Sequence, residues 1–101
     1  MPKLYEYFGL IILFYSSEHE PIHVHGLCDG RECRAELIVR NGEVVRIRYL
    51  SVKGRLPLTP RTMARFKKAV SHFRQEIVSK WIEYFVLHKH VESERITRRL
   101  S

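Results

Sequence analysis

Three of the six histidines fall within seven residues, at His19, His23 and His25, beside two glutamates. We refer to residues 18–25 as the histidine box. Imidazole binds divalent metals and exchanges protons near neutral pH. Three histidines that leave one position open for water can hold zinc or another divalent metal. Without metal, an imidazole oriented by a glutamate can act as a general acid or base. The box therefore predicts a catalytic site of His19, His23, His25 and Glu20, or a metal site of the three histidines.

The histidine box also matches H-E-x-x-H, the zinc-protease motif, in which both histidines must lie on one face of a helix. Pro21 stands inside this match, and a proline in a helix interior breaks the helix. Alternation of apolar and polar residues resumes directly after the proline, which indicates a strand. Side chains alternate along a strand, so His23 and His25 are expected on one face. The box is therefore predicted to be a loop-to-strand corner, not a zinc-protease helix.

Short apolar runs separated by glycine turns predict an antiparallel meander. The expected strands cover residues 8–15, 22–27, 31–39 and 43–50. Asp29-Gly30 is typical of a two-residue hairpin loop, which would pair His23 with Glu36 and His25 with Arg34. This register gathers the polar residues on one face of the sheet.

The second hairpin turns at Asn41-Gly42. A two-residue loop there would place Arg46 opposite Leu37 and mix polar with apolar residues. A three-residue loop with a bulge at Gly42 would instead place Arg46 opposite Glu36 and Val45 opposite Leu37. The bulged register is therefore preferred.

Residues 60–87 carry apolar side chains at steps of three and four, the pattern of an amphipathic helix that begins after Thr59 as the N-cap. One straight helix of this length would extend about 42 Å, which exceeds the diameter of a small domain. A break is therefore expected near residues 72–75, although one long helix or two shorter ones both fit the pattern. The prediction is a single α+β domain over residues 1–90, with about four antiparallel strands packed by these helices, and a polar tail over 91–101.

The chain is basic, with 18 Lys and Arg against 11 Asp and Glu and a formal charge of +7. Such a charge favours anionic partners such as RNA or an acidic protein, although a basic surface that is merely solvated is the alternative. The residues expected to bind such a partner are Arg34, Arg46, Arg48, Lys53, Arg55, Arg61, Arg65 and Lys68. Arg34 stands in the strand over residues 31–39. The others follow the last strand, the next loop and the first helical turns, and are expected to form one surface.

The apolar run over residues 8–15 is too short to span a bilayer, and it lacks the basic start and cleavage site of a signal peptide. A cytoplasmic location with reduced cysteines is therefore expected, and no membrane partner. Cys28 or Cys33, across the first glycine hairpin, is a further candidate metal ligand because thiolates bind zinc.

The sequence resembles a family of small bacterial proteins named domain of unknown function 4160. The resemblance covers residues 4–87 and rests on these segments: Phe14-Tyr15-Ser16, the histidine box, the glycine hairpin, Gly54-Arg55-Leu56-Pro57, and Trp81. It implies an α+β fold with a small antiparallel sheet and C-terminal helices. It also implies a small protein partner encoded nearby, of the type named domain of unknown function 2442, in toxin–antitoxin-like modules.

No activity follows from this resemblance, which carries over only the positions of His19, His23 and His25. The expected function is a component of a toxin–antitoxin-like module that binds RNA or an acidic protein, with ribonuclease activity as one form. The alternatives are a metal-binding protein or metal-dependent hydrolase, and a non-catalytic protein-interaction module.

Overall fold

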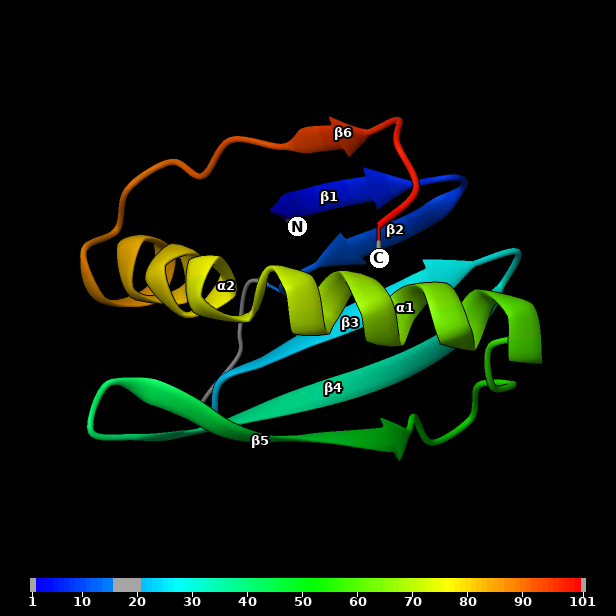
Figure 1. Cartoon of the computed structure of the whole chain (residues 1–101), viewed down its shortest axis with the longest axis horizontal. Coiled ribbons are helices and arrows are strands. Elements are labelled where there is room, and N and C mark those ends of the chain that lie inside the picture. The colour runs from blue at the N-terminus through cyan, green and yellow to red at the C-terminus, as the bar shows by residue number, and fades with distance from the viewer. Residues whose placement is uncertain (1, 16–20, 101) are drawn as a thin grey trace.

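Six strands form one sheet and the helices cover one of its faces in the computed structural model, which describes residues 2–15 and 21–100 (Figure 1). The strands are β1 (Lys3–Tyr7), β2 (Leu10–Leu13), β3 (His23–Cys28), β4 (Arg31–Arg40), β5 (Glu43–Ser51) and β6 (Glu94–Ile96). They lie in the order β5-β4-β3-β2-β1-β6. Neighbouring strands are antiparallel except for β6, which runs parallel to β1. The expected α+β class is confirmed, but the sheet is larger than the four strands predicted.

The helical layer consists of α1 (Pro60–His72), α2 (Arg74–Trp81) and a π-helical turn, η1 (Ile82–Val86). Thr59 caps α1, since its side-chain oxygen accepts a hydrogen bond from the Thr62 amide at 3.3 Å. The chain bends at Phe73 (φ −99°, ψ 16°), which separates α1 from α2. The break expected near residues 72–75 is therefore confirmed. Among the described residues, no helix combines the length and the apolar character that a membrane span requires.

The strand predicted over residues 8–15 is present as the shorter β2, but its predicted start is wrong, because Phe8 and Gly9 form the turn of a hairpin between β1 and β2. Both turn residues have positive φ, +49° at Phe8 and +84° at Gly9. A phenylalanine rarely adopts this left-handed conformation, so the sequence gives no turn signal before Gly9. The N-terminal segment therefore supplies two strands where one was expected.

The register between β3 and β4 is confirmed, with His23 opposite Glu36 and His25 opposite Arg34. The register predicted for the next hairpin is wrong. Asn41-Gly42 is a two-residue turn, and the irregularity lies further along, between Ile38 and Val39. As a result Arg48, not Arg46, lies opposite Glu36. A bulge was predicted in the loop to keep polar and apolar residues on separate faces. The structure has this bulge within the strands instead.

The core lies between the helices and the face of β3 and β4 that carries Val24, Gly26 and Ala35. At Gly26 the helix approaches so closely that an added Cβ would lie 2.7 Å from the Phe66 ring. The opposite face of these strands, called the open face because α1 does not cover it, carries His23 and His25, although His23 is packed against Trp81 at the end of α2.

The segment 91–101, expected to be a polar tail outside the domain, contributes β6 to the sheet. Its apolar residues Val91, Ile96 and Leu100 are buried, with at most 6% of each residue exposed. These three side chains are too widely spaced to form a helical or strand pattern in the sequence, but they are sufficient to fix the segment against β1. Part of this segment therefore belongs to the folded domain.

Candidate functional site

His23 and His25 project from the same face of β3, as the alternation of side chains requires. Their rings meet edge to face with centroids 5.2 Å apart, and only 6% of each residue is exposed. His23 Nδ1 lies 2.7 Å from the Pro21 carbonyl oxygen, and its ring packs 5.5 Å from Trp81. The two histidines are therefore held in a packed corner between the start of β3 and the end of α2.

Glu32 is the carboxylate that orients His25. His25 Nδ1 lies 3.0 Å from Glu32 Oε2, and the Tyr15 hydroxyl donates to the same oxygen at 2.9 Å. The Tyr15 ring also packs against the His25 ring, with 4.2 Å between centroids. A carboxylate on one ring nitrogen fixes the tautomer and the orientation of an imidazole, as acid–base and metal sites both require.

Arg55 completes this buried network from the loop after β5. Its Nε lies 3.5 Å from Glu32 Oε1, and its Nη2 donates to the Gly30 carbonyl at 3.1 Å. The same loop also accepts a hydrogen bond at the Leu56 carbonyl from the Glu32 amide. Arg55, predicted to bind an anionic partner, therefore fixes its own loop against the β3–β4 hairpin.

Glu36 holds a second set of charges on the same open face of the sheet. Arg34 Nη2 lies 3.2 Å from one carboxylate oxygen and Arg48 Nη1 lies 3.7 Å from the other. These arginines are partly exposed, with 38% and 49% of their side chains accessible. Much of the positive charge predicted for this face is therefore balanced by a carboxylate.

The other two members of the predicted catalytic set, His19 and Glu20, lie outside the described residues. Among residues 2–15 and 21–100, no three His, Cys, Asp or Glu side chains are grouped so that they could hold a metal ion. Bound zinc through His19, His23 and His25 stays a prediction, and metal analysis of untagged protein tests it.

The suggestion that a cysteine completes a metal site with the histidines is wrong. Cys33 pairs with Gly26 and Cys28 pairs with Arg31, so both thiols lie on the face opposite to His23 and His25. Cys33 is buried beneath the helical layer, and its thiol donates to the Leu50 carbonyl at 3.5 Å. Burial raises the pKa of the Cys33 thiol, which disfavours a thiolate.

The eight predicted basic residues do not form one surface. Arg34, Arg46 and Arg48 lie on the open face of the sheet, whereas α1, which carries Arg61, Arg65 and Lys68, covers the other face. Lys53 is exposed in the turn after β5. The sheet therefore separates two basic regions with different surroundings.

The helix-side region forms a groove of about 360 Å³. It is lined by Tyr7, Phe8, Arg61, Ala64, Arg65, Lys68 and Arg99. Three of these residues were predicted to bind an anionic partner. Phe8 and Arg99 were missed, because Phe8 stands in a turn that the sequence does not signal and Arg99 in a segment taken for a tail.

Glu32 and Tyr15, which contact His25 on the other face of the sheet, were also missed, although the predicted register already placed Glu32 on the histidine face.

A model of the family described as "Domain of unknown function (DUF4160)" matches residues 9–82. No curated protein matches the chain. No solved structure matches it either. The matched region contains the histidine box, Glu32 and Arg55, and it ends within η1, so it excludes Arg99.

Proposed function

The chain belongs to the DUF4160 family, whose description assigns no activity, and we propose from its surface that it binds RNA along the exposed side of α1. The carrying observation is a group of cations that form no ion pair with any carboxylate of the described residues. Within the described residues, no ion pair involves Arg61, Arg65, Lys68 or Arg99. A phosphate backbone supplies the charge that such a group lacks.

The sequence of α1 supports this proposal independently. The helix contains Arg61, Arg65, Lys67 and Lys68 but no acidic residue, and its first turn is without Asp or Glu. A helix N-terminus carries partial positive charge, so an arginine at its second residue is unfavourable for the isolated helix. The charge pattern is therefore better explained by an anionic ligand than by the stability of α1.

The open face of the sheet is the weaker candidate for RNA. There Glu36 balances Arg34 and Arg48, and Glu32 balances Arg55. An RNA strand would have to compete with these pairs. The toxin–antitoxin-like module that the family resemblance implies is consistent with an RNA-binding component.

Fluorescence anisotropy with a labelled single-stranded RNA of twelve nucleotides tests the proposal. The variant Arg61→Glu/Arg65→Glu/Lys68→Glu removes the helix-side cations. The matched control Arg40→Glu/Arg46→Glu/Lys53→Glu reverses three exposed charges elsewhere, so both proteins have the same net charge. We expect the affinity of the helix variant for RNA to fall about a hundredfold and that of the control only a few fold. The reason is that direct contacts with phosphates contribute more to affinity than long-range electrostatic attraction does. Equal losses would mean that net charge alone attracts RNA, and would refute the proposed surface.

The same RNA tests the ribonuclease form of the function. The buried Glu32–His25 pair is the observation that favours it, because it fixes the orientation of one imidazole. Cleavage by the wild type that is lost in His23→Ala and His25→Ala would support catalysis by the histidine box. Intact RNA after prolonged incubation with wild-type protein would exclude it under those conditions while leaving RNA binding unaffected.

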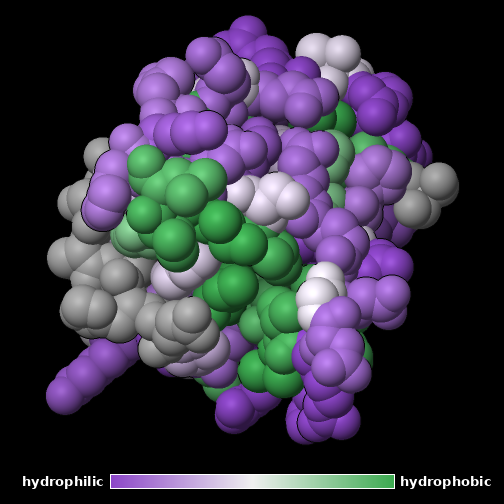
Figure 2. All heavy atoms as spheres, turned by 90° about the vertical axis from the view of Figure 1, so that its left-hand side faces the viewer, coloured by the Kyte–Doolittle hydropathy of each residue, from purple (hydrophilic) through white to green (hydrophobic). Residues whose placement is uncertain are grey.

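A second candidate function is docking of a protein partner through the side of the molecule seen in Figure 2. There apolar side chains form a broad band. The exposed apolar residues of the chain include Val39, Val45, Ile82, Val86 and Leu87. A shallow groove beside the edge strand β5 is lined by apolar side chains that include Val45 and by the basic residues Arg46, Lys67 and Arg74. The partner that fits is an acidic extended segment with alternating apolar residues, added along β5.

Co-expression with the neighbouring gene product tests this second candidate. Val45→Asp places a negative charge in this groove and should abolish co-purification of an acidic partner. Val86→Asp, on η1, is a matched exposed substitution outside that groove and should reduce it less. Unchanged co-purification of both variants would exclude docking at β5.

A further inference from the structure

Three hairpins of this chain turn through the same pair of left-handed residues, and one of them has an unexpected side chain. The φ values are +52° and +75° at Asp29-Gly30, +53° and +80° at Asn41-Gly42, and +49° and +84° at Phe8-Gly9. Asp and Asn tolerate this conformation, whereas a bulky aromatic residue is strained in it. The conformation of the turn therefore gives no reason for phenylalanine at position 8.

The Phe8 side chain gains little from burial at this position. The residue is 48% exposed, and its ring packs on the buried Tyr7 ring with 4.9 Å between centroids. An exposed, strained aromatic residue at the mouth of a groove is better explained by contact with a ligand than by the stability of the fold.

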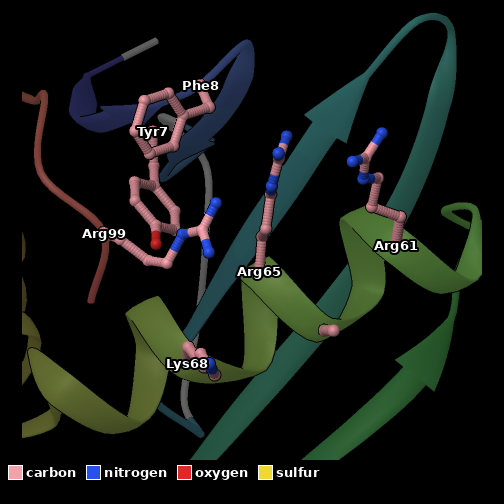
Figure 3. Close-up of a pocket in the computed structure, with 7 residues that line it drawn as sticks. Tyr7, Phe8, Arg61, Arg65, Lys68 and Arg99 are labelled. Carbon is pink, nitrogen blue, oxygen red and sulfur yellow. The ribbon is translucent and has the colours of Figure 1, made fainter. Parts of the chain in front are cut away.

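The groove beside Phe8 collects guanidinium groups from two distant parts of the chain. Figure 3 shows Arg65 projecting from α1, and Arg99 projecting from the C-terminal segment, toward the space beside the two aromatic rings, with Arg61 farther from the rings on the preceding turn of α1. Arg65 Cζ lies 5.4 Å above the centroid of the Phe8 ring. The volume of about 360 Å³ is at the lower end of the range for small-ligand pockets, which suits part of a strand rather than a duplex.

Arg99 is fixed at the groove by its neighbour. The Leu100 amide donates to the Tyr7 hydroxyl at 2.9 Å, and only 2% of Leu100 is exposed. This bond holds the C-terminal backbone against β1 and keeps Arg99 opposite α1. The Phe8 ring and the backbone of Arg99 are therefore positioned by the fold before any ligand arrives, and Arg65 covers the ring until then.

We propose that this groove binds single-stranded nucleic acid, with one unpaired base stacked on Phe8. The base takes the place of Arg65 over the Phe8 ring, and the phosphates on either side of it pair with the displaced Arg65 and with Arg99. Arg61 and Lys68 extend the cationic path along α1. This inference rests on the proposed RNA binding and adds that the bound nucleic acid must be single-stranded. Stacking on an aromatic ring needs a base whose face is free, and it tolerates any base because each has a π-face. The site therefore selects single strands without selecting a sequence.

Phe8→Asn is a decisive variant, because asparagine already occupies the same position in the turn at Asn41-Gly42. It removes the ring and also relieves the strained turn, so the folded protein should melt at or above the wild-type temperature. We expect its affinity for a single-stranded RNA to fall about tenfold, since stacking of one base on an aromatic residue is in this range. Phe8→Tyr keeps the ring and should keep the affinity. Binding of duplex RNA should be weaker in the wild type and unchanged in Phe8→Asn.

Two results would overturn this inference while leaving the proposed function intact. The first is that Phe8→Asn binds the single strand as tightly as the wild type does. The second is that the wild type binds single-stranded and duplex RNA with equal affinity. Absence of any RNA binding by the wild type would instead refute the proposed function itself. Comparing the affinities for single-stranded RNA and single-stranded DNA of the same sequence shows whether the site distinguishes the two. Equal affinity supports recognition of base and phosphate alone, and preference for RNA supports the same stacking site with an added contact to the 2′-hydroxyl.

Discussion

Replacing Glu32 by glutamine tests whether the buried network under the histidine box stabilises the fold. Glu32 is 3% exposed, and its two oxygens receive three groups: Tyr15, His25 and Arg55. Glutamine has nearly the same size but offers one acceptor oxygen and one donor nitrogen. At least one of the three groups must then lose its acceptor.

The structure sets the magnitude of this loss. Breaking a fully buried ion pair costs about 3–5 kcal/mol, but Arg55 is 41% exposed and can turn toward water, which lowers its share. Leaving one buried polar group without a partner costs about 1–3 kcal/mol. We therefore expect Glu32→Gln to lower the free energy of unfolding by about 2 kcal/mol, which corresponds to roughly 10 °C in Tm for a domain of this size.

Thermal unfolding followed by circular dichroism at neutral pH measures this effect. Glu36→Gln is the matched control, since Glu36 holds two arginines that are 38% and 49% exposed on the same sheet face. Its loss should stay below about 1 kcal/mol, because partly exposed pairs contribute little. A Tm for Glu32→Gln within about 2 °C of the wild type, or a larger loss for Glu36→Gln, would refute the account of the network.

Three further predictions concern the core. Gly26→Ala should destabilise the fold by about 1–3 kcal/mol in a denaturant titration, because its Cβ would meet the Phe66 ring at 2.7 Å; a neutral result would mean that α1 shifts freely. Burial raises the pKa of Tyr49 to about 12 while an unfolded tyrosine titrates near 10, so its contribution to stability is complete below pH 10 and is lost as the pH rises toward 12. Tyr49→Phe should therefore show a shallower fall of Tm across that range, and an unchanged profile would contradict this. With a thiol reagent at pH 8, Cys28 should react first and Cys33 only on unfolding, because burial raises the pKa of Cys33. Cys33→Ser should remove the slow phase of the reaction, and two thiols that react equally fast would contradict the burial of Cys33.

The sequence predicts best those parts of the fold that local chemistry determines. A two-residue Asp-Gly turn and strict alternation fix the register that pairs His23 with Glu36. The length of the apolar helical pattern requires the break found at Phe73. The first hairpin escapes prediction because Phe8 adopts a turn conformation against its own preference. Strand β6 escapes because its pairing with β1 depends on contacts between opposite ends of the chain.

In the candidate site, too, local sequence predicts some features, whereas others depend on contacts between distant residues. Placing His23 and His25 on one face needs only the period of a strand, but finding Tyr15 beside Glu32 needs the position of a residue beyond the end of β2. Counting arginines predicts an anionic ligand without showing which charges are already balanced. That distinction requires the structure, in which Glu36 pairs with Arg34 while Arg65 faces only an aromatic ring among the described residues.

The salt dependence of RNA binding tests the central proposal most directly. For single strands the slope of log K against log salt is about −0.7 for each phosphate neutralised, so four cations in the groove predict a slope near −3. The variant Arg61→Glu/Arg65→Glu/Lys68→Glu should bind more weakly and with a slope closer to zero than −1. A wild-type slope near zero, or a variant that keeps the full wild-type slope, would contradict RNA binding by the α1 groove.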